Sequence, residues 1–367
     1  MKMKYLLFGL AAVLAGTAFW ADSGHVGAKS AAVSLDDGSR FVFVPSRTDP
    51  EVSVLDTARD EIVATLKLDR VASQVVVSDS TGRLAASNIE NKSLTIVDLR
   101  THQLLKTMAL DLTPERMVIS PDGYLVGIGD AKQGVVAVVS ILDYREMARV
   151  GGFVEPTKLT FGLDGSQLYV TDSATNRLAL IDVVQNKRMF DIPVAPTNRR
   201  PASARAGVQP PETVSALTRT PDGRYGFVAN AQDNTLKVID LSTEKVIRTL
   251  QVGRAPLRPY GTADGRLMLV PNEGDATVSV VDTTMLQVVA TLPGGRGVQA
   301  INTGWFESLA LVVSAAERKL VLLDLVKFQS AGEIPLPGKP GPGVVTPGGD
   351  KLYVALTDAD KIAVIDV

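Results

Sequence analysis

Short runs of apolar residues recur along this chain in one fixed order. An apolar run, a polar turn, a second apolar run and a closing aspartate read KLYVALTDADKIAVIDV at the chain's end and SQLYVTDSATNRLALIDV earlier. The closing aspartates are Asp56, Asp98, Asp143, Asp182, Asp240, Asp282, Asp324 and Asp366. Their separations are 42, 45, 39, 58, 42, 42 and 42 residues. This near-constant spacing indicates an internal structural repeat.

One period predicts four short strands. Residues 214–220, 224–229, 235–240 and 245–252 are apolar or alternating runs, separated by turns rich in Gly, Pro, Asn and Asp. Such a pattern is typical of an antiparallel meander. We expect the aspartates to serve the turns, because each recurs once per repeat and a carboxylate can accept hydrogen bonds from the turn that follows it.

A four-stranded unit of 42 residues cannot bury both of its faces alone, so neighbouring units must cover them. The repeat therefore predicts an all-β fold, an eight-bladed β-propeller of four-stranded antiparallel blades. A seven-bladed ring with irregular ends is the alternative, and a pair of β-sandwiches is a more distant one. The last repeat ends after its third strand. We expect residues 19–27 to supply the fourth strand and so cover that open edge.

Three motifs connect the repeat to a known family. Leu-Tyr-Val-Thr-Asp at 168–172, Val-Ile-Asp at 238–240 and Val-Gly-x-x-Pro at 252–256 resemble the YVTN-type bacterial propeller repeat. The resemblance runs from about residue 28 to the end, and residues 127–130 and 303–306 depart from it. It implies a β-propeller that is exported and that binds a ligand or protein, and it implies little about chemistry.

The first residues differ from the repeats. Lys2 and Lys4 precede an apolar run over 5–15, and small residues follow at 16–18. This order predicts a signal peptide over 1–18, with Ala21 as the alternative end, followed by a single propeller domain over 19–367. The protein is then periplasmic or secreted. The run is short for a bilayer span, although an uncleaved anchor is the alternative, and no later segment is apolar enough to cross.

Composition narrows the chemistry. The chain of 367 residues has no cysteine, two histidines and a formal net charge of −2. These values exclude disulfides, thiolate sites and zinc or copper sites built on several histidines, and they argue against nucleic-acid binding. We find no nucleophile elbow, phosphate loop or dinucleotide fingerprint in a suitable context. The sequence therefore favours a binding protein over an enzyme, and no metal site is predicted.

The gap of 58 residues marks an insertion over 193–213, rich in Pro, Ala and Gly. It joins the outermost strand of one blade to the innermost strand of the next. We expect such loops to surround the mouth of the central channel, where arginines could bind an anion. The candidate ligand-binding residues are Arg70, Arg116, Arg199, Arg200, Arg205, Arg254, Arg258 and Arg296. The competing interpretation is scattered, solvated charge, because acidic turns at the same face bring its balance close to neutral.

Four further residues interrupt the repeat pattern. His25 is a candidate axial haem ligand, and a solvated histidine near a chain end is the alternative. His102 falls in a turn on the opposite face, so the two histidines are not expected to converge. Trp305 and Phe306 replace an Asp-Gly turn and either pack over a blade or form a contact patch.

Three functions fit these observations. The first is a non-enzymatic scaffold that binds a protein or a small anionic ligand through the channel mouth and the 193–213 loop. The second follows from a more distant resemblance to the haem-binding propeller of periplasmic nitrite reductases, which implies an anionic, haem-type tetrapyrrole in the central cavity. The third is a lactonase-like hydrolase, for which no acid–base pair is identified.

Overall fold

The structure is a computed structural model of the whole chain. It describes residues 3–7, 9–10, 21–22, 40–46, 48–195, 214–303, 307–346, 348–358 and 361–367. For residues before Arg40 only the backbone is described. The described residues are almost entirely strands and turns, and none lies in an α-helix. Accordingly, no helix in this part of the chain has the length and apolarity that crossing a bilayer requires.

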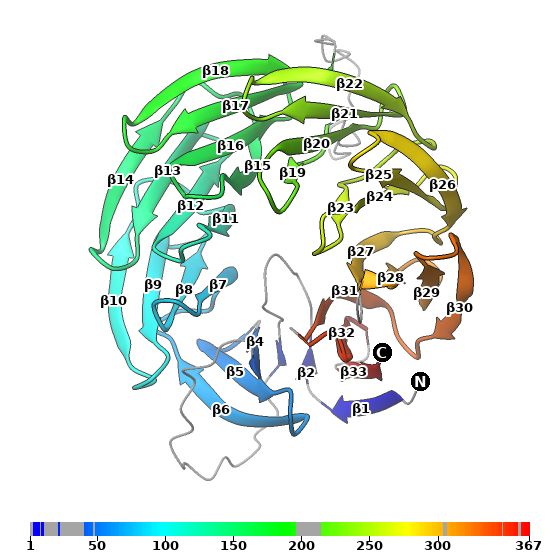
Figure 1. The fold of residues 1–367 in the computed structure, drawn as a ribbon. Helices are drawn as coiled ribbons and strands as arrows, with labels where there is room; N and C mark the ends of the chain where they lie inside the picture. The colour runs from blue at the N-terminus through cyan, green and yellow to red at the C-terminus, as the bar shows by residue number, and fades with distance from the viewer. Residues whose placement is uncertain are drawn as a thin grey trace, which may run out of the picture. The chain divides into compact units, whose positions relative to one another are not determined.

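Eight antiparallel sheets form the blades, as the repeat predicts, and the fold class is an eight-bladed β-propeller (Figure 1). Contacts between Cα atoms divide the chain into two compact units. Unit 1 comprises residues 1–126, 139–145 and 294–367, and unit 2 comprises residues 127–138 and 146–293. The seven-bladed alternative would leave one of these sheets unexplained.

Unit 1 contains four sheets. Blade 1 is β4 (Phe41–Pro45), β5 (Glu51–Asp56) and β6 (Glu61–Lys67). Blade 2 is β7 (Gln74–Ser78), β8 (Arg83–Asn88), β9 (Ser93–Asp98) and β10 (Leu104–Ala109). Blade 7 is β27 (Val298–Thr303), β28 (Leu309–Ser314), β29 (Lys319–Asp324) and β30 (Gln329–Pro335). Blade 8 is β31 (Pro340–Val345), β32 (Lys351–Leu356), β33 (Lys361–Asp366) and β1 (Met3–Leu7).

Unit 2 contains three sheets. Blade 4 is β15 (Pro156–Phe161), β16 (Gln167–Asp172), β17 (Arg177–Asp182) and β18 (Lys187–Pro193). Blade 5 is β19 (Thr218–Arg219), β20 (Tyr225–Asn230), β21 (Thr235–Asp240) and β22 (Lys245–Gln251). Blade 6 is β23 (Tyr260–Gly261), β24 (Leu267–Asn272), β25 (Thr277–Asp282) and β26 (Gln287–Pro293). Blade 3, with residues in both units, is β11 (Arg116–Ile119), β12 (Leu125–Asp130), β13 (Val135–Ser140) and β14 (Arg145–Val150). A short pair, β2 (Gly9–Leu10) and β3 (Ala21–Asp22), precedes the blades.

The second and third strands of each blade are covered on both faces. Every residue of β24 is buried, and so are residues 320–323 and 362–365 of the third strands. Outermost strands are open, and β30 is exposed at nearly every position. This gradient is what radial stacking predicts, because a middle strand then has a neighbouring blade on each side.

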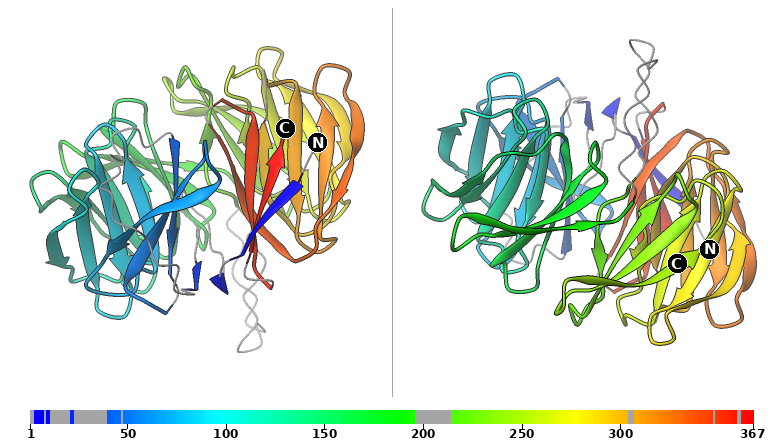
Figure 2. Two further views of the ribbon diagram at one scale, coloured as in Figure 1. Left: turned by 90° about the horizontal axis from the view of Figure 1, so that it is seen from below. Right: turned by 90° about the horizontal axis from the view of Figure 1, so that it is seen from above.

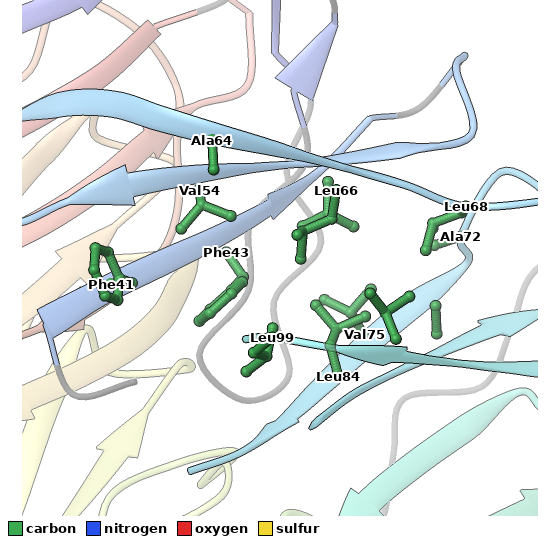
Figure 3. Close-up of a cluster of buried hydrophobic side chains, with 13 residues drawn as sticks. Phe41, Phe43, Val54, Ala64, Leu66, Leu68, Ala72, Val75, Leu84 and Leu99 are labelled. Carbon is green, nitrogen blue, oxygen red and sulfur yellow. The ribbon is translucent and has the colours of Figure 1, made fainter. Parts of the chain in front are cut away.

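The space between blades is filled by large apolar side chains. Phe41 and Phe43 of β4 belong to one buried cluster with Leu84 of β8, Leu66 and Leu99 (Figure 3). In unit 2, Phe227 of β20 packs with Met268 of β24 in a similar cluster. Burial of this kind is worth about 1.5–3 kcal/mol for each large side chain, so these layers dominate the stability of the fold.

The closing aspartates serve turns, as predicted. The Asp98 Oδ1 accepts hydrogen bonds from the N–H groups of Arg100 (2.9 Å) and Thr101 (2.8 Å). Asp182, Asp240, Asp282 and Asp324 accept bonds in the same way. Blade 3 requires a correction, because Ser140 rather than Asp143 ends its third strand. The Ser140 Oγ accepts the N–H of Asp143 at 3.0 Å, and using Ser140 restores a spacing of 42 residues on both sides.

The Asp-Gly turns are also confirmed. Gly123, Gly165, Gly223 and Gly265 have φ between 70° and 78°, which glycine adopts without steric cost. Asp37-Gly38 lies outside the described residues.

The strand that completes blade 8 differs from the prediction. Met3–Leu7 pairs with β33, with Met3 opposite Ile365 and Leu7 opposite Lys361 (Figure 2). Of residues 19–27 the structure describes Ala21–Asp22, which pairs with Gly9–Leu10, and the β33 edge is occupied by Met3–Leu7 instead. An open strand edge offers unpaired N–H and C=O groups to any extended segment that reaches it. The prediction was therefore right about the N-terminal region and wrong about the residues.

Candidate functional site

Each blade has two ends, and one of them carries the loops that lead to the next blade. We call this the connection end. It holds the turn between the second and third strands and the loop that enters the blade's innermost strand. In blade 4, the Asp172 carboxylate at the start of that turn accepts the N–H groups of Val154 and Glu155, each at 3.0 Å, in the entering loop. The two segments are thereby fixed to each other.

A buried polar residue ends the second strand of most blades at this place. Asn88, Asp130, Asp172, Asn230, Asn272 and Ser314 are all at most 8% exposed. The Asn88 Nδ2 donates to the carbonyl of Val71 at 2.7 Å, and the Ser314 Oγ donates to the carbonyl of Arg296 at 2.6 Å. The Oδ1 of Asn272 has no hydrogen-bond partner among the described residues, but where the buried polar groups are paired they make the connection loops rigid supports for exposed side chains.

Side chains also link neighbouring innermost strands. The Gln74 amide exchanges two hydrogen bonds with the backbone of Met117, with Nε2 to carbonyl at 3.1 Å and N–H to Oε1 at 2.9 Å. In unit 2, the Lys158 Nζ donates to the carbonyl of Val214 at 2.8 Å, and the Thr218 Oγ1 donates to that of Pro259 at 2.7 Å. Sequence reasoning missed Lys158. Its position in an innermost strand with no acidic residue was the signal available.

Three predicted arginines lie at the connection end in unit 1. Arg116 begins β11, and Arg296 lies in the loop before β27. Both side chains are exposed, and neither has a carboxylate partner among the described residues. Arg70 lies before β7, with its Nε 3.7 Å from Asp69, too long for a hydrogen bond. All three guanidinium groups therefore keep donors directed to solvent.

Glycines set the position of Arg296. Gly295 and Gly297 on either side have φ of 73° and 64°. A Cβ at Gly297 would lie 2.8 Å from the N atom of Ala316, so only glycine allows this loop to approach the neighbouring turn. The N–H of Ala316 in turn donates to the carbonyl of Arg296 at 3.3 Å.

Two predicted arginines lie in unit 2, and they differ in their hydrogen bonding. Arg254 is held by Asp275, whose carboxylate accepts its Nε and, at 2.6 Å, its backbone N–H. Its Nη2 also donates to the carbonyl of Gly274 at 3.1 Å. Arg258 is exposed, and its nearest described partner is the Thr218 Oγ1, 3.5 Å from its Nε. Arg258 thus keeps its capacity to bind an anion, whereas that of Arg254 is largely used within the fold.

The remaining predicted residues cannot be placed. Arg199, Arg200, Arg205 and His25 lie outside the described residues, as do Trp305 and Phe306. The stem of the 193–213 insertion is described at one end, where Pro193, Val194 and Ala195 line an open, shallow groove with Lys237 and Val246. His102 lies in the turn after β9, away from the connection end, with φ of 60°.

The ionisable groups whose pKa values are shifted support the fold of the blades. The N–H of Lys327 is the main cause of the lowered pKa of Asp324, and the hydroxyl of Ser242 does the same for Asp240. Burial raises the pKa of Tyr169 to about 12. In the part of the chain that the structure describes, no group of three or more His, Asp or Glu side chains is arranged to hold a metal ion. These shifts follow from turn hydrogen bonds and packing rather than from an acid–base pair.

Solved structures similar to this chain share its fold. Dihydro-heme d1 dehydrogenase NirN in complex with DHE superposes with a TM-score of 0.73 at 17% identity, covering 92% of this chain and 72% of that one. Hydrazine synthase of Kuenenia stuttgartiensis gives 0.56 at 18% identity, covering 81% and 95%. The β-propeller domain of Cps50 (Swd1) of Myceliophteria thermophila gives 0.56 at 12% identity, covering 81% and 99%. At these identities the similarity shows the fold alone.

A comparison with curated proteins finds no match. A family model described as YNCE-like beta-propeller matches residues 91–367, which is most of the chain and includes the repeats from β9 onward. Together with the eight blades and their shared turn chemistry, this match shows that the chain belongs to the YNCE-like β-propeller family.

Proposed function

We propose that this protein is an exported binding scaffold, not an enzyme, and that it binds its ligand or partner protein at the connection ends of its blades. One observation carries the proposal. Arg116, at the start of β11, and Arg258 and Arg296, in connection loops, present exposed guanidinium groups with no carboxylate partner among the described residues. Arginine in this state offers planar donors that match carboxylate or phosphate groups.

Export is part of the proposal. Residues 1–18 are the leader, with cleavage after Ala18 or, as the alternative, after Ala21, and the mature protein works in the periplasm or outside the cell. The basic residues Lys2 and Lys4 and the apolar run that follows them support this. Sequencing of the mature N-terminus is expected to begin at Phe19, and recovery of the intact N-terminus from the cytoplasm would contradict export.

The connection end is tested by placing a photo-reactive residue at position 258 and, in a second variant, at position 248. Arg248 is a matched control because it is an exposed arginine in the same unit, on the outermost strand β22. We expect a defined crosslinked partner at position 258 and none at position 248. Equal crosslinking at both positions would remove the support for a site at the connection end.

A second candidate is the binding of a haem-type tetrapyrrole. It is favoured by the similarity to NirN, which was solved in complex with DHE. The carboxylates of a tetrapyrrole would be suitable partners for unpaired arginines. The predicted residue His25 would then be the candidate axial ligand.

Titration of the mature protein with iron protoporphyrin IX tests this second candidate. We expect a shifted visible band when the ligand binds. Arg116→Glu and Arg296→Glu should each weaken the affinity about tenfold, which corresponds to about 1.4 kcal/mol, while Arg248→Glu should leave the affinity unchanged. If His25→Ala abolishes the band, ligation by histidine is supported. An unshifted spectrum for the parent protein would contradict tetrapyrrole binding, and the scaffold function would then be the one remaining candidate.

A further inference from the structure

The innermost strands of unit 2 form a wall without acidic residues. β15, β19 and β23 lie side by side on the inner side of blades 4, 5 and 6 (Figure 1). The Thr160 Oγ1 donates to the carbonyl of Leu217 at 2.9 Å, and the Thr218 Oγ1 donates to that of Pro259 at 2.7 Å. We call residues 156–162, 214–220 and 256–262 the inner wall. They include no Asp or Glu.

Arg219 of β19 is a partly buried cation in the inner wall. Its Nε donates to the carbonyl of Phe161, in the neighbouring strand β15, at 3.1 Å. Burial lowers the pKa of the Arg219 guanidinium, and no carboxylate among the described residues counteracts that effect. Its two Nη groups have no partner in the described part of the chain, so the charge is partly desolvated without a counter-ion.

Arg258, the other arginine of the inner wall, is held in a similar way. Its side chain is exposed, and its Nε lies 3.5 Å from the Thr218 Oγ1. Because that hydroxyl donates its own proton to Pro259, it can only accept from Arg258. A guanidinium contacted at Nε alone presents its two Nη groups side by side, which is the arrangement that binds both oxygens of a carboxylate or phosphate.

Most arginines of unit 2 outside the inner wall pair with a carboxylate. These pairs are Arg149 with Glu146, Arg177 and Arg188 with Asp191, Arg254 with Asp275, and Arg266 with Asp264. Two others lie elsewhere in blade 5, where Arg224 is over the ring of Tyr225 and Arg248 is on the outermost strand β22. The unpaired arginines of unit 2 thus include both members of the inner wall.

The repeat does not require an arginine at position 219. Strand register gives its equivalents, because Arg219 lies opposite Gly226, Phe161 opposite Leu168 and Gly261 opposite Met268. An aromatic residue and a glycine therefore occupy the same place in the neighbouring blades. The fold does not explain a partly buried charge there, whereas an anionic ligand would.

The two guanidinium groups lie on opposite sides of β19. Successive side chains of a strand point in opposite directions, and Thr218 contacts the strand of blade 6 whereas Arg219 contacts that of blade 4. Arg258 approaches Thr218 from the side of blade 6. A ligand that contacts both arginines must therefore carry two anionic groups, joined by a spacer that crosses β19.

We propose that unit 2 binds a ligand with two separated carboxylate or phosphate groups, one at Arg219 and the other at Arg258. The inference rests on the proposed function, with which it shares Arg258, and it extends that site along the inner wall to Arg219. The second contact of such a ligand is intramolecular, so a dianion should bind more tightly than a monoanion of the same length.

Calorimetric titration of the purified protein with two series of probes tests this. One series is the linear dicarboxylates from succinate to sebacate, the other is the bisphosphates of the corresponding diols, and octanoate is the monoanion. We expect at least one dianion to bind about tenfold more tightly than octanoate, and the tighter series identifies the anion. Arg219→Gln and Arg258→Gln should each remove this advantage. Arg248→Gln, the matched control in blade 5, should leave it unchanged.

Two further measurements separate binding from a structural role of Arg219. Arg219→Lys keeps the charge without the paired Nη groups, so it should recover only part of the affinity that Arg219→Gln loses. Without ligand, the melting temperature of Arg219→Gln should not lie below that of the parent, because a partly buried charge is removed. A lower melting temperature together with unchanged affinity would assign Arg219 to the fold and overturn the inference.

Two outcomes of the titration would also overturn it. One is that no dianion binds more tightly than octanoate, and the other is that Arg219→Gln binds the dianions as the parent does. Crosslinking at position 258 does not depend on these probes. A partner found there, together with either outcome, would therefore overturn this inference and leave the proposed function in place.

Discussion

At the scale of single residues, the repeat is maintained by carboxylates that accept hydrogen bonds from turns. The Asp324 Oδ1 accepts the N–H groups of Lys327 at 2.8 Å and Val326 at 2.9 Å. Ser140 does the same work in blade 3 without a charge. What recurs in each blade is therefore a side-chain acceptor for the turn, and not always an aspartate. This is why a search for aspartate found the repeat but misplaced one of its members by three residues.

The lowered pKa values of these aspartates predict how stability depends on pH. A carboxyl group whose pKa is lower in the folded state stabilises that state above its ordinary pKa of 3.8, and the contribution is lost as the pH falls below that value. We expect the melting temperature to fall steeply between pH 4 and about pH 2. Asp324→Asn keeps an acceptor oxygen and removes the titrating carboxyl group. In a plot of melting temperature against pH, the fall below pH 4, which we call the acid limb, should therefore be shallower for this variant than for the parent.

Glu90→Gln is the control for this prediction, because it removes one exposed carboxylate from a turn in the same unit. It should leave the acid limb as in the parent protein. Parallel acid limbs for the parent and Asp324→Asn would contradict a stabilising role for the charged turn aspartate.

At the scale of elements, the strand that completes blade 8 has two assignments. β1, Met3–Leu7, pairs with β33, yet the same residues fall within the leader proposed for export. Cleavage after Ala18 would remove β1 and leave the N–H and C=O groups of the β33 edge unpaired. The completeness of the last blade thus depends on how the N-terminus is processed.

Amide hydrogen exchange at residues 361–366 measures this dependence. We expect faster exchange there in a chain that begins at Phe19 than in the chain with residues 1–18 present, because β33 loses one neighbour. Blade 7 is the internal reference, since β29 keeps β30 in both proteins. Equal exchange in the two chains would show that another segment replaces β1.

A disulfide test fixes the register in the longer chain. The protein has no cysteine, so a pair introduced at Tyr5 and Ala363, which lie opposite each other, can link only to each other. Tyr5→Cys with Val364→Cys is the control, since neighbouring positions in a strand face opposite sides. Crosslinking of the control pair alone would refute the register.

At the scale of the whole molecule, periodicity alone was sufficient to predict eight blades, their strand order and the burial of the middle strands on both faces. These follow from one physical requirement, that a two-faced apolar sheet needs a neighbour on each side. Arg116, Arg258 and Arg296 lie at the connection ends of their blades, where the sequence analysis expected the loops between blades; their role in binding stays a prediction. It did not show that Arg254 is paired, because Asp275 is 21 residues away and the fold brings the two together.

The side-chain contacts between neighbouring blades were likewise beyond sequence reasoning. Lys351 and Asp60 are 291 residues apart, and nothing in either local sequence marks them as partners. Only alignment of the blades by strand register shows that Arg83, Tyr225 and Lys351 hold the same position. Contacts between repeats depend on pairs of positions, whereas a repeat search compares single positions.

The outermost strands share one irregularity. The pairing of third and fourth strands shifts register in blades 1, 2, 4, 5, 6 and 7, at Val54/Leu55 in blade 1 and Leu322/Leu323 in blade 7, for example. A bulge twists an edge and disrupts the straight ladder that a foreign strand would need. The register shift therefore makes the outer edge of each of these blades a poorer template for an added strand than a straight ladder would be.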